Sequence, residues 1–122
     1  MNLPEATKSG IKKAATFSGR ASRAEYWYFV LFTILVSFAA GFVLALSIGA
    51  NASTDQLNHA TLVLRYVLYA VFFLPTLSLA VRRIHDTGRS GWFVLIPIYS
   101  FVLMFFQSDP NDNQYGPVNP IE

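Results

Sequence analysis

The chain has 122 residues, of which 53% are hydrophobic and only 13% are charged. Water-soluble domains carry roughly 25% charged residues, so this composition predicts a protein whose solvent is a lipid bilayer. The length predicts a single domain. The chain has no cysteine, which excludes disulfides, thiol nucleophiles and thiolate metal sites.

Residues 1–21 are predicted to form a basic tail on the cytoplasmic side. Leu3 and Ile11 lie among lysines, a pattern that fits either a helix lying on the membrane surface or a flexible tail. Ser22 and Glu25 have the spacing of a capping box, which predicts that a helix begins there. Trp27 follows at the depth expected for an interfacial aromatic residue.

The first apolar block, residues 26–50, contains no charged residue. As a helix it would be about 37 Å long at about 1.5 Å per residue, enough to cross a hydrocarbon core of about 30 Å. Ala50-Asn51-Ala52 resembles a signal-peptidase site. The apolar run is much longer than the usual ~7–15 residues of a signal peptide, so we expect an uncleaved anchor.

Small residues recur every four positions in this block, at Ser37, Gly41, Ala45 and Gly49. Such a stripe allows another helix to approach closely in lipid. The partner is either another helix of the same chain or a second copy of the chain. We favour packing within the chain.

Two further apolar blocks follow, at residues 62–81 and 91–107, and Pro75 and Pro97 interrupt them. Arg65 lies near the start of the first of these blocks, where its side chain can reach the headgroups at the outer end of the helix. The block 91–107 is near the lower limit of about 17 residues for a span. If this block is re-entrant, the tail returns to the cytoplasm. We interpret the two prolines as structural kinks rather than as parts of a transport site.

Basic residues alternate between the connections. Lysine and arginine are abundant before residue 26 and in residues 82–90, and they are absent from 51–61 and from 108–122. By the positive-inside rule, the N-terminus and loop 82–90 are predicted to be cytoplasmic, and residues 51–61 and the tail 108–122 periplasmic. The sequence therefore predicts an all-α integral membrane protein with three transmembrane helices and short loops.

The charges on the predicted cytoplasmic face are complementary. We expect Glu25 near Arg82 or Arg83, and Asp86 near Arg20 or Arg23. The alternative is a set of solvated charges that only fix topology. Trp92 is expected at the same interface as Trp27. The predicted polar network consists of Arg20, Arg23, Glu25, Arg82, Arg83, His85, Asp86 and Arg89.

Catalytic chemistry is weakly indicated. His85, Asp86 and Ser90 are the residue types of a catalytic triad, but a triad requires a specific spatial arrangement rather than neighbours in sequence. The two histidines, His59 and His85, are predicted on opposite sides of the membrane, so no metal site and no cofactor is predicted. The basic clusters fit anionic lipid headgroups better than nucleic acid.

Three stretches resemble a known family. They are FSGRASRAEYW at residues 17–27, RRIHDTGRSGW at residues 82–92, and Tyr115-Gly116-Pro117 with Pro120. Together they are similar to the small bacterial inner-membrane proteins grouped as domain of unknown function 805, the YhaH-like proteins. The resemblance implies a bacterial inner-membrane protein and implies no particular reaction.

We therefore expect a non-enzymatic inner-membrane protein that acts through contacts with anionic lipids or other envelope proteins, in a role such as envelope maintenance. The alternative is a subunit of a small oligomeric transporter or channel. That alternative requires a homo-oligomer, and the lack of ionisable residues in the spans apart from Arg65 argues against an ion-coupled pump. A membrane-bound hydrolase or transferase is the least supported interpretation.

Overall fold

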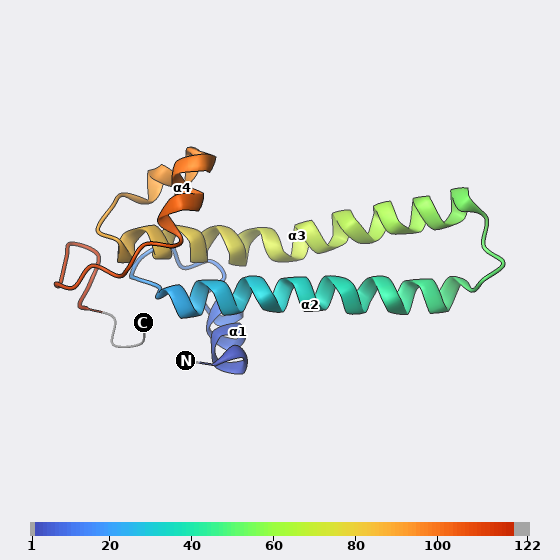
Figure 1. Ribbon diagram of the computed structural model, residues 1–122, viewed down its shortest axis with the longest axis horizontal. Coiled ribbons are helices and arrows are strands. Elements are labelled where there is room, and N and C mark those ends of the chain that lie inside the picture. The colour runs from blue at the N-terminus through green and yellow to red at the C-terminus, as the bar shows by residue number, and fades with distance from the viewer. Residues whose placement is uncertain (1, 119–122) are drawn as a thin grey trace.

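Two long antiparallel helices dominate the computed structural model, which describes residues 2–118 (Figure 1). Helix α2 spans Arg23–Ile48 and helix α3 spans Thr54–Asp86. The short connection between them begins at Gly49, whose φ of 84° is readily adopted by glycine. Residues 119–122 lie outside the described part, so the position of Pro120 and the end of the predicted tail are not assigned.

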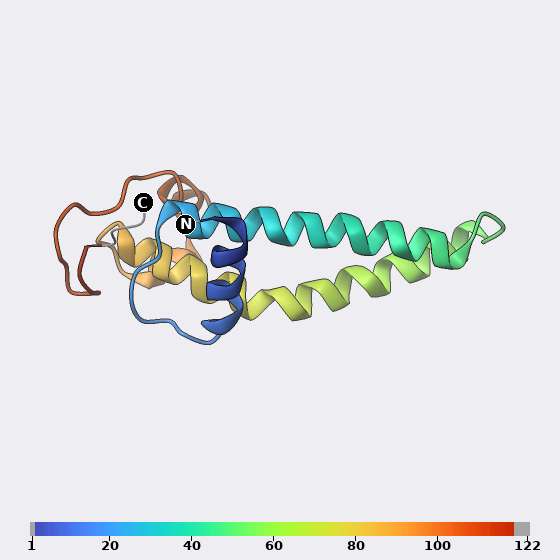
Figure 2. The same ribbon diagram turned by 90° about the horizontal axis from the view of Figure 1, so that it is seen from below.

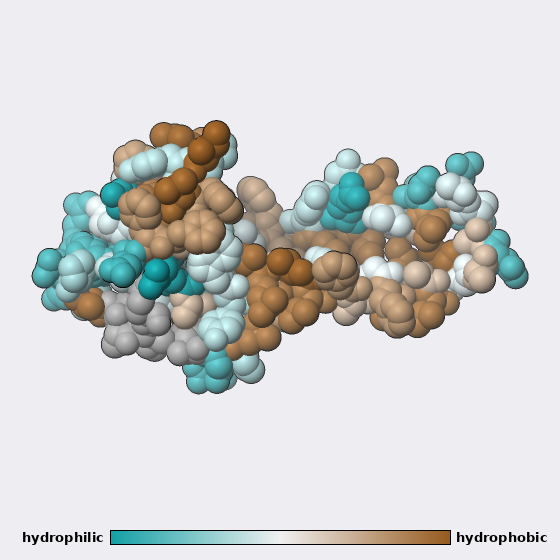
Figure 3. Space-filling view, in the orientation of Figure 1, coloured by the Kyte–Doolittle hydropathy of each residue, from teal (hydrophilic) through white to brown (hydrophobic). Residues whose placement is uncertain are grey.

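The two helices are long enough and apolar enough to cross a bilayer. Their 26 and 33 residues correspond to about 39 and about 50 Å, against a hydrocarbon core of about 30 Å. Much of the surface of the hairpin is apolar, and hydrophilic residues gather at its two ends and on part of α3 (Figure 3). Helix α2 begins three residues before the predicted block, after Ser22, whose side chain accepts a hydrogen bond from the Glu25 N–H.

Helix α3 is much longer than the predicted block 62–81. A capping box formed by Ser53 and Gln56 starts it eight residues before Leu62. At the other end it continues to Asp86, so most of the charged segment predicted as a loop at 82–90 is helical. This difference places the charged side chains in the last turns of a helix, on fixed faces relative to α2.

The third apolar block does not form a continuous helix. It contains a short 3-10 helix, η1 (Gly91–Leu95), and a seven-residue helix, α4 (Pro97–Leu103). Seven residues span only about 10 Å, so block 91–107 does not form the continuous membrane-length helix that the sequence predicts. Pro97 is the physical reason for the break, because it lacks an N–H and begins α4 instead of continuing the preceding helix.

The tail does not lie at the opposite end of the hairpin from segment 82–90, as the prediction of a third span required. Asp109 N–H donates to Asp86 C=O over 2.7 Å, and the described part of the tail surrounds the end of α3 (Figure 1). The tail and the charged end of α3 therefore share one end of the molecule.

Helix α1 (Leu3–Lys12) occupies the segment predicted as a surface helix or a flexible tail. It lies across the hairpin rather than along it (Figure 2). Gly10 rests directly on Phe29, because a Cβ added at this glycine would come within 2.4 Å of the Phe29 ring. Ser78 Oγ, on α3, donates to Lys13 C=O over 3.2 Å, so α1 and the residue that follows it are anchored to both long helices.

The core is small and lies where α1, α2 and α3 meet. Phe29 and Leu79 are fully buried, and Phe32 and Phe72 pack against them. A second cluster joins α3 to α4 through Ile84, Leu103 and their neighbours. Elsewhere the hairpin exposes large apolar side chains, as expected for helices whose partner is lipid.

Candidate functional site

The candidate site is the polar end of the molecule. We use this name for α1, residues 13–22, the last turns of α3 and residues 104–118. Arg20 is central to it, although its side chain is only 3% exposed. Its Nε donates to Asp86 Oδ1 over 2.8 Å, and its Nη2 donates to the carbonyl of Asp109 over 2.8 Å. Its Nη1 donates to the carbonyls of Asn111 and Gly116. Arg20 thus ties the segment before α2 to the end of α3 and to the tail.

Asp86 is the acceptor that organises this end. It is fully buried, and both of its carboxylate oxygens accept hydrogen bonds from arginines. Arg83 Nη1 donates to Asp86 Oδ2 over 2.6 Å, Arg83 Nη2 donates to the carbonyl of Phe106, and Ser108 Oγ also donates to Asp86 Oδ2. A buried carboxylate with several charge-assisted partners is favourable, whereas an unpaired one is costly.

Glu25 forms the second ion pair. Arg82 Nη1 donates to Glu25 Oε1 over 3.3 Å, and Ser9 Oγ on α1 donates to the same oxygen over 2.7 Å. The Glu25 carboxylate therefore bonds to other elements, while its own backbone N–H is capped by Ser22. Arg82 is 1% exposed, and its Nε and Nη2 have no partner within residues 2–118. Glu25 is accordingly the main counter-charge of Arg82.

His85 holds the tail by its ring. The ring stacks on Tyr115 with centroids 4.0 Å apart and planes 2° apart. Its Nδ1 lies 3.0 Å from the carbonyl of Gly19, so Nδ1 carries the proton and donates it. Asn113 adds a bond from its side-chain amide to the His85 carbonyl over 3.3 Å.

The remaining predicted residues surround this centre. Arg23 donates to the carbonyl of Phe105 over 3.4 Å. Arg89 donates to the Tyr99 hydroxyl over 3.1 Å and lies 5.2 Å from the Phe106 ring centroid.

The two tryptophans differ in exposure. Trp27 Nε1 donates to the carbonyl of Met104 over 3.0 Å, and its ring packs on Phe105. Trp92 is 79% exposed. Trp27 thus belongs to the packing between α2 and the segment after α4, and Trp92 is available to contact lipid.

The structure brings the two predicted ion pairs together, and sequence reasoning missed the tail and Ser9. Asp109, Asn113 and Tyr115 were assigned to the opposite side because residues 108–122 lack lysine and arginine. The acceptors that the tail offers to Arg20 are the main-chain carbonyls of Asp109, Asn111 and Gly116. Every residue type carries such a carbonyl, so nothing in the sequence points to these contacts. Nothing in the sequence points to Ser9 either.

The arrangement does not form a catalytic triad among the described residues. The Asp86 carboxylate bonds to arginines rather than to His85, and the Ser90 side chain accepts from the Trp92 N–H. Residues 2–118 contain no cluster of three or more metal-binding side chains of the His, Cys, Asp and Glu types. The side chains of the polar end form ion pairs and hydrogen bonds that hold the elements together at one end of the hairpin.

The pKa of the Asp109 carboxyl, in the tail, is shifted by the groups around it. Hydrogen bonds from the Asn111 N–H and the Asn113 side-chain amide, with the Arg20 charge nearby, lower the pKa of Asp109 below its ordinary value of 3.8. The carboxylate is thereby favoured in the folded tail.

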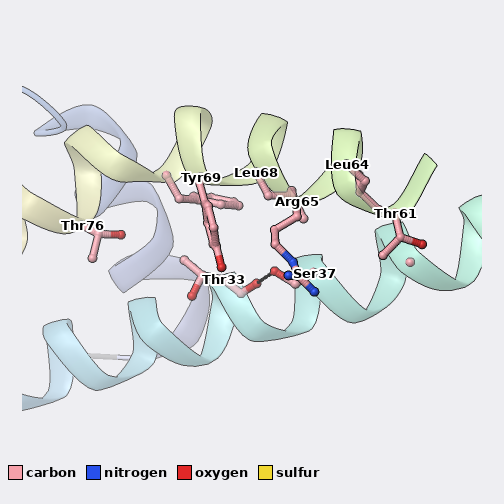
Figure 4. A pocket seen from close by; sticks show the side chains of 10 residues that line it. Thr33, Ser37, Thr61, Leu64, Arg65, Leu68, Tyr69 and Thr76 are labelled. Atoms are coloured by element: carbon pink, nitrogen blue, oxygen red, sulfur yellow. Dashed lines mark hydrogen bonds between the residues drawn. The ribbon is translucent and has the colours of Figure 1, made fainter. Parts of the chain in front are cut away.

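The stripe of small residues does not make the predicted close contact between helices. A Cβ added at Gly41 would have no neighbouring atom within 4 Å. Ala45 is exposed, and Gly49 ends α2. Ser37 and Gly41 instead line a cleft that faces α3 (Figure 4).

Comparison with known proteins gives consistent matches. The family model described as "Protein of unknown function (DUF805)" matches residues 14–117. The chain is 37% identical over 115 residues to "Inner membrane protein YhaI" of Escherichia coli (strain K12), covering 88% of this chain and 89% of that protein. It is 29% identical over 119 residues to "Inner membrane protein YhaH" of the same strain, covering 92% and 93%. No solved structure gives a significant match.

Proposed function

The chain belongs to the DUF805 family of proteins of unknown function, and we propose that it is a non-enzymatic inner-membrane protein that acts through contacts with lipid at its polar end. In this proposal α2 and α3 cross the bilayer as a hairpin, and the polar end, with the N-terminus and the tail, lies on the cytoplasmic side. The observation that carries it is the pair of exposed flanks beside the buried charge network, one basic on α1 and one apolar on η1 and α4.

The elements flanking the network suit a position in the membrane interface. Helix α1 lies across the hairpin and carries exposed Lys8 and Lys12, with exposed Lys13 just after it. Basic side chains near an anionic surface contribute about 1 kcal/mol each. A basic helix held across the spans places these charges at headgroup level.

On the other side of the hairpin, η1 and α4 expose large apolar side chains: Trp92 by 79%, Leu95 by 71% and Ile98 by 82%. Such a surface is unfavourable in water and favourable at the boundary between headgroups and acyl chains. We infer that α1 contacts headgroups while η1 and α4 insert shallowly. Both flanks would then rest on the same leaflet.

The topology is tested by paired reporters, active either only in the cytoplasm or only in the periplasm, fused in turn to each terminus. Both termini should report the cytoplasm. Termini on opposite sides would refute the two-span arrangement, since the tail cannot leave the polar end without breaking the Arg20 contacts. Two periplasmic termini would refute the proposed orientation.

The lipid contact is tested in nanodiscs of phosphatidylglycerol or phosphatidylcholine. The wild type should unfold at a higher temperature in phosphatidylglycerol, and a variant with Lys8, Lys12 and Lys13 all changed to Gln should lose that difference.

Replacing Trp27 with Phe leaves Trp92 as the single tryptophan. Lipids brominated near the headgroup should then quench its fluorescence more than lipids brominated at the chain end, and the reverse order would contradict shallow insertion.

A further inference from the structure

A cleft separates α2 from α3 in the apolar part of the hairpin, away from the polar end. Its volume is about 410 Å³, within the range of about 300–1,000 Å³ that is usual for ligand sites. The side chains drawn in Figure 4 reach into it from both helices. Arg65 is its only charged lining residue, and the other lining residues are apolar or carry a hydroxyl group.

Arg65 lies farther from the start of its helix than the sequence predicts. Because α3 begins at Thr54 rather than at Leu62, Arg65 is more than three turns inside the helix, about 16 Å from its start. The part of α3 that precedes the polar end, residues 54–77, is about 36 Å long, and Arg65 is near its middle. Its side chain points across to α2 and the region of Ser37 instead of toward the end of the helix (Figure 4).

Arg65 has no counter-ion in the described chain. No salt bridge or hydrogen bond joins it to any of residues 2–118. Helix α2 contains no acidic residue after Glu25, and the nearest acid on α3 is Asp55, ten positions away. An arginine within a span is unfavourable unless it is paired or hydrated, and such residues mark functional sites.

The hydroxyl groups of α2 do not replace a counter-ion. Thr33 Oγ1 donates to the Val30 carbonyl over 2.7 Å, and Ser37 Oγ donates to the Thr33 carbonyl over 2.7 Å. Their oxygens can accept, but their protons are engaged within α2. The guanidinium is therefore the principal unengaged donor in the cleft, and its planar fork matches a carboxylate or phosphate.

We propose that this cleft binds an amphiphile with an acidic headgroup, a carboxylate or a phosphate, with its acyl chain against Leu64, Leu68 and Phe72. The cleft lies within the span, so a molecule dissolved in the lipid phase reaches it directly. The cation requires an anionic head, and the apolar walls require a hydrocarbon chain. This site is distinct from the polar end, and its occupancy does not depend on which side of the membrane that end faces.

The test is native mass spectrometry of the full chain in a neutral detergent. Four probes are titrated separately: oleic acid, phosphatidylglycerol, phosphatidylcholine and inorganic phosphate. One oleate or phosphatidylglycerol should bind per chain, and Arg65→Gln should weaken it by about tenfold or more, because a charge-assisted pair is lost. Arg65→Lys keeps the positive charge but lacks the planar guanidinium, so its affinity should lie between those of the wild type and Arg65→Gln. Whether oleate or phosphatidylglycerol binds more tightly distinguishes a fatty acid from a phospholipid.

Two matched variants keep the proposal falsifiable. Gly41→Leu fills the cleft but leaves Arg65 in place, and the open space at Gly41 allows the variant to fold. It should bind as weakly as Arg65→Gln. Tyr66→Phe, which alters a residue outside the cleft lining, should bind like the wild type. Equal binding by wild type and Arg65→Gln would overturn the proposal, as would phosphatidylcholine binding as tightly as phosphatidylglycerol or binding of inorganic phosphate alone.

Discussion

Arg20 and Asp86 are 66 positions apart in the sequence, yet Arg20 Nε donates to Asp86 Oδ1 over 2.8 Å, and the two side chains are only 3% and 0% exposed. This pair joins the segment before the first long helix to the end of the second. It also fixes the tail, because the same guanidinium binds the Asp109 carbonyl. The pair therefore sets the arrangement of the whole polar end.

Asp86→Asn should strongly destabilise the protein. The change removes the negative charge that faces both Arg20 and Arg83 in a buried place, and breaking such a pair costs about 3–5 kcal/mol. The measurement is unfolding in a mild detergent. Asp55→Asn, at the exposed start of α3, is the matched control and should change stability by less than about 1 kcal/mol. Similar losses for both variants would mean that Asp86 is not the organising charge.

Glu25→Ala should destabilise the protein more than Lys8→Ala. The first change leaves Arg82 buried without its carboxylate and removes the acceptor of Ser9, whereas the Lys8 side chain is exposed. A double-mutant cycle with Arg82→Met isolates the pair, and the coupling free energy should be at least about 0.5 kcal/mol. Additive losses would indicate that the 3.3 Å contact contributes little.

Gly10→Ala should loosen α1, although alanine favours helices. The added Cβ would lie 2.4 Å from the Phe29 ring, and overpacking of this kind costs about 1–3 kcal/mol. Gly41→Ala is the control: the same change in another helix meets nothing within 4 Å, so it should be neutral or stabilising. Thermal unfolding compares the two, and a stabilised Gly10→Ala variant would show that α1 does not rest on Phe29.

Tyr115→Ala should release the tail, and Tyr115→Phe should not. The stacking of Tyr115 on His85 needs the ring rather than the hydroxyl, and aromatic pairs contribute about 0.5–1.5 kcal/mol beyond their buried area. The chain has no cysteine, so a dye on Val118→Cys reports the tail alone. Its fluorescence anisotropy should fall in the alanine variant, and equal anisotropy in all three proteins would exclude the stacking as an anchor.

Acidification should weaken the attachment of the tail through Asp109. The pKa of this carboxyl is lower in the folded tail than its ordinary value of 3.8, so the folded form binds fewer protons near that pH. Its stabilising contribution is present above the ordinary value and is lost as the pH falls through the lowered pKa. The anisotropy of the dye at residue 118 should therefore drop in acid less steeply in Asp109→Asn than in the parent. Identical pH profiles in the two proteins would show that the Asp109 carboxyl does not control the attachment of the tail.

Much of the molecule could be predicted from local patterns. The charge-free run after Tyr26 predicts a long helix, because in lipid every backbone group must be satisfied within its own segment. Ser22 and Glu25 predict its start. The complementary charges around Glu25 and Asp86 indicate the two ion pairs, since both sets flank apolar blocks that emerge at one face.

Three features were decided only by the tertiary structure. The block 91–107 has the composition of a span, but the break at Pro97 leaves a seven-residue helix that packs beside α3. Counting lysine and arginine placed the tail on the wrong end of the hairpin, because that count ignores acceptors such as the Asp109 carbonyl, which buried arginines bind. Ser53 starts α3 early, so Arg65 lies more than three turns inside the helix and lines a cleft between α2 and α3. Hydrophobicity and charge along the chain determine that this protein has membrane-length helices with a charged end. Which segments cross, and which cations are left without a partner, depend on contacts between residues far apart in the sequence.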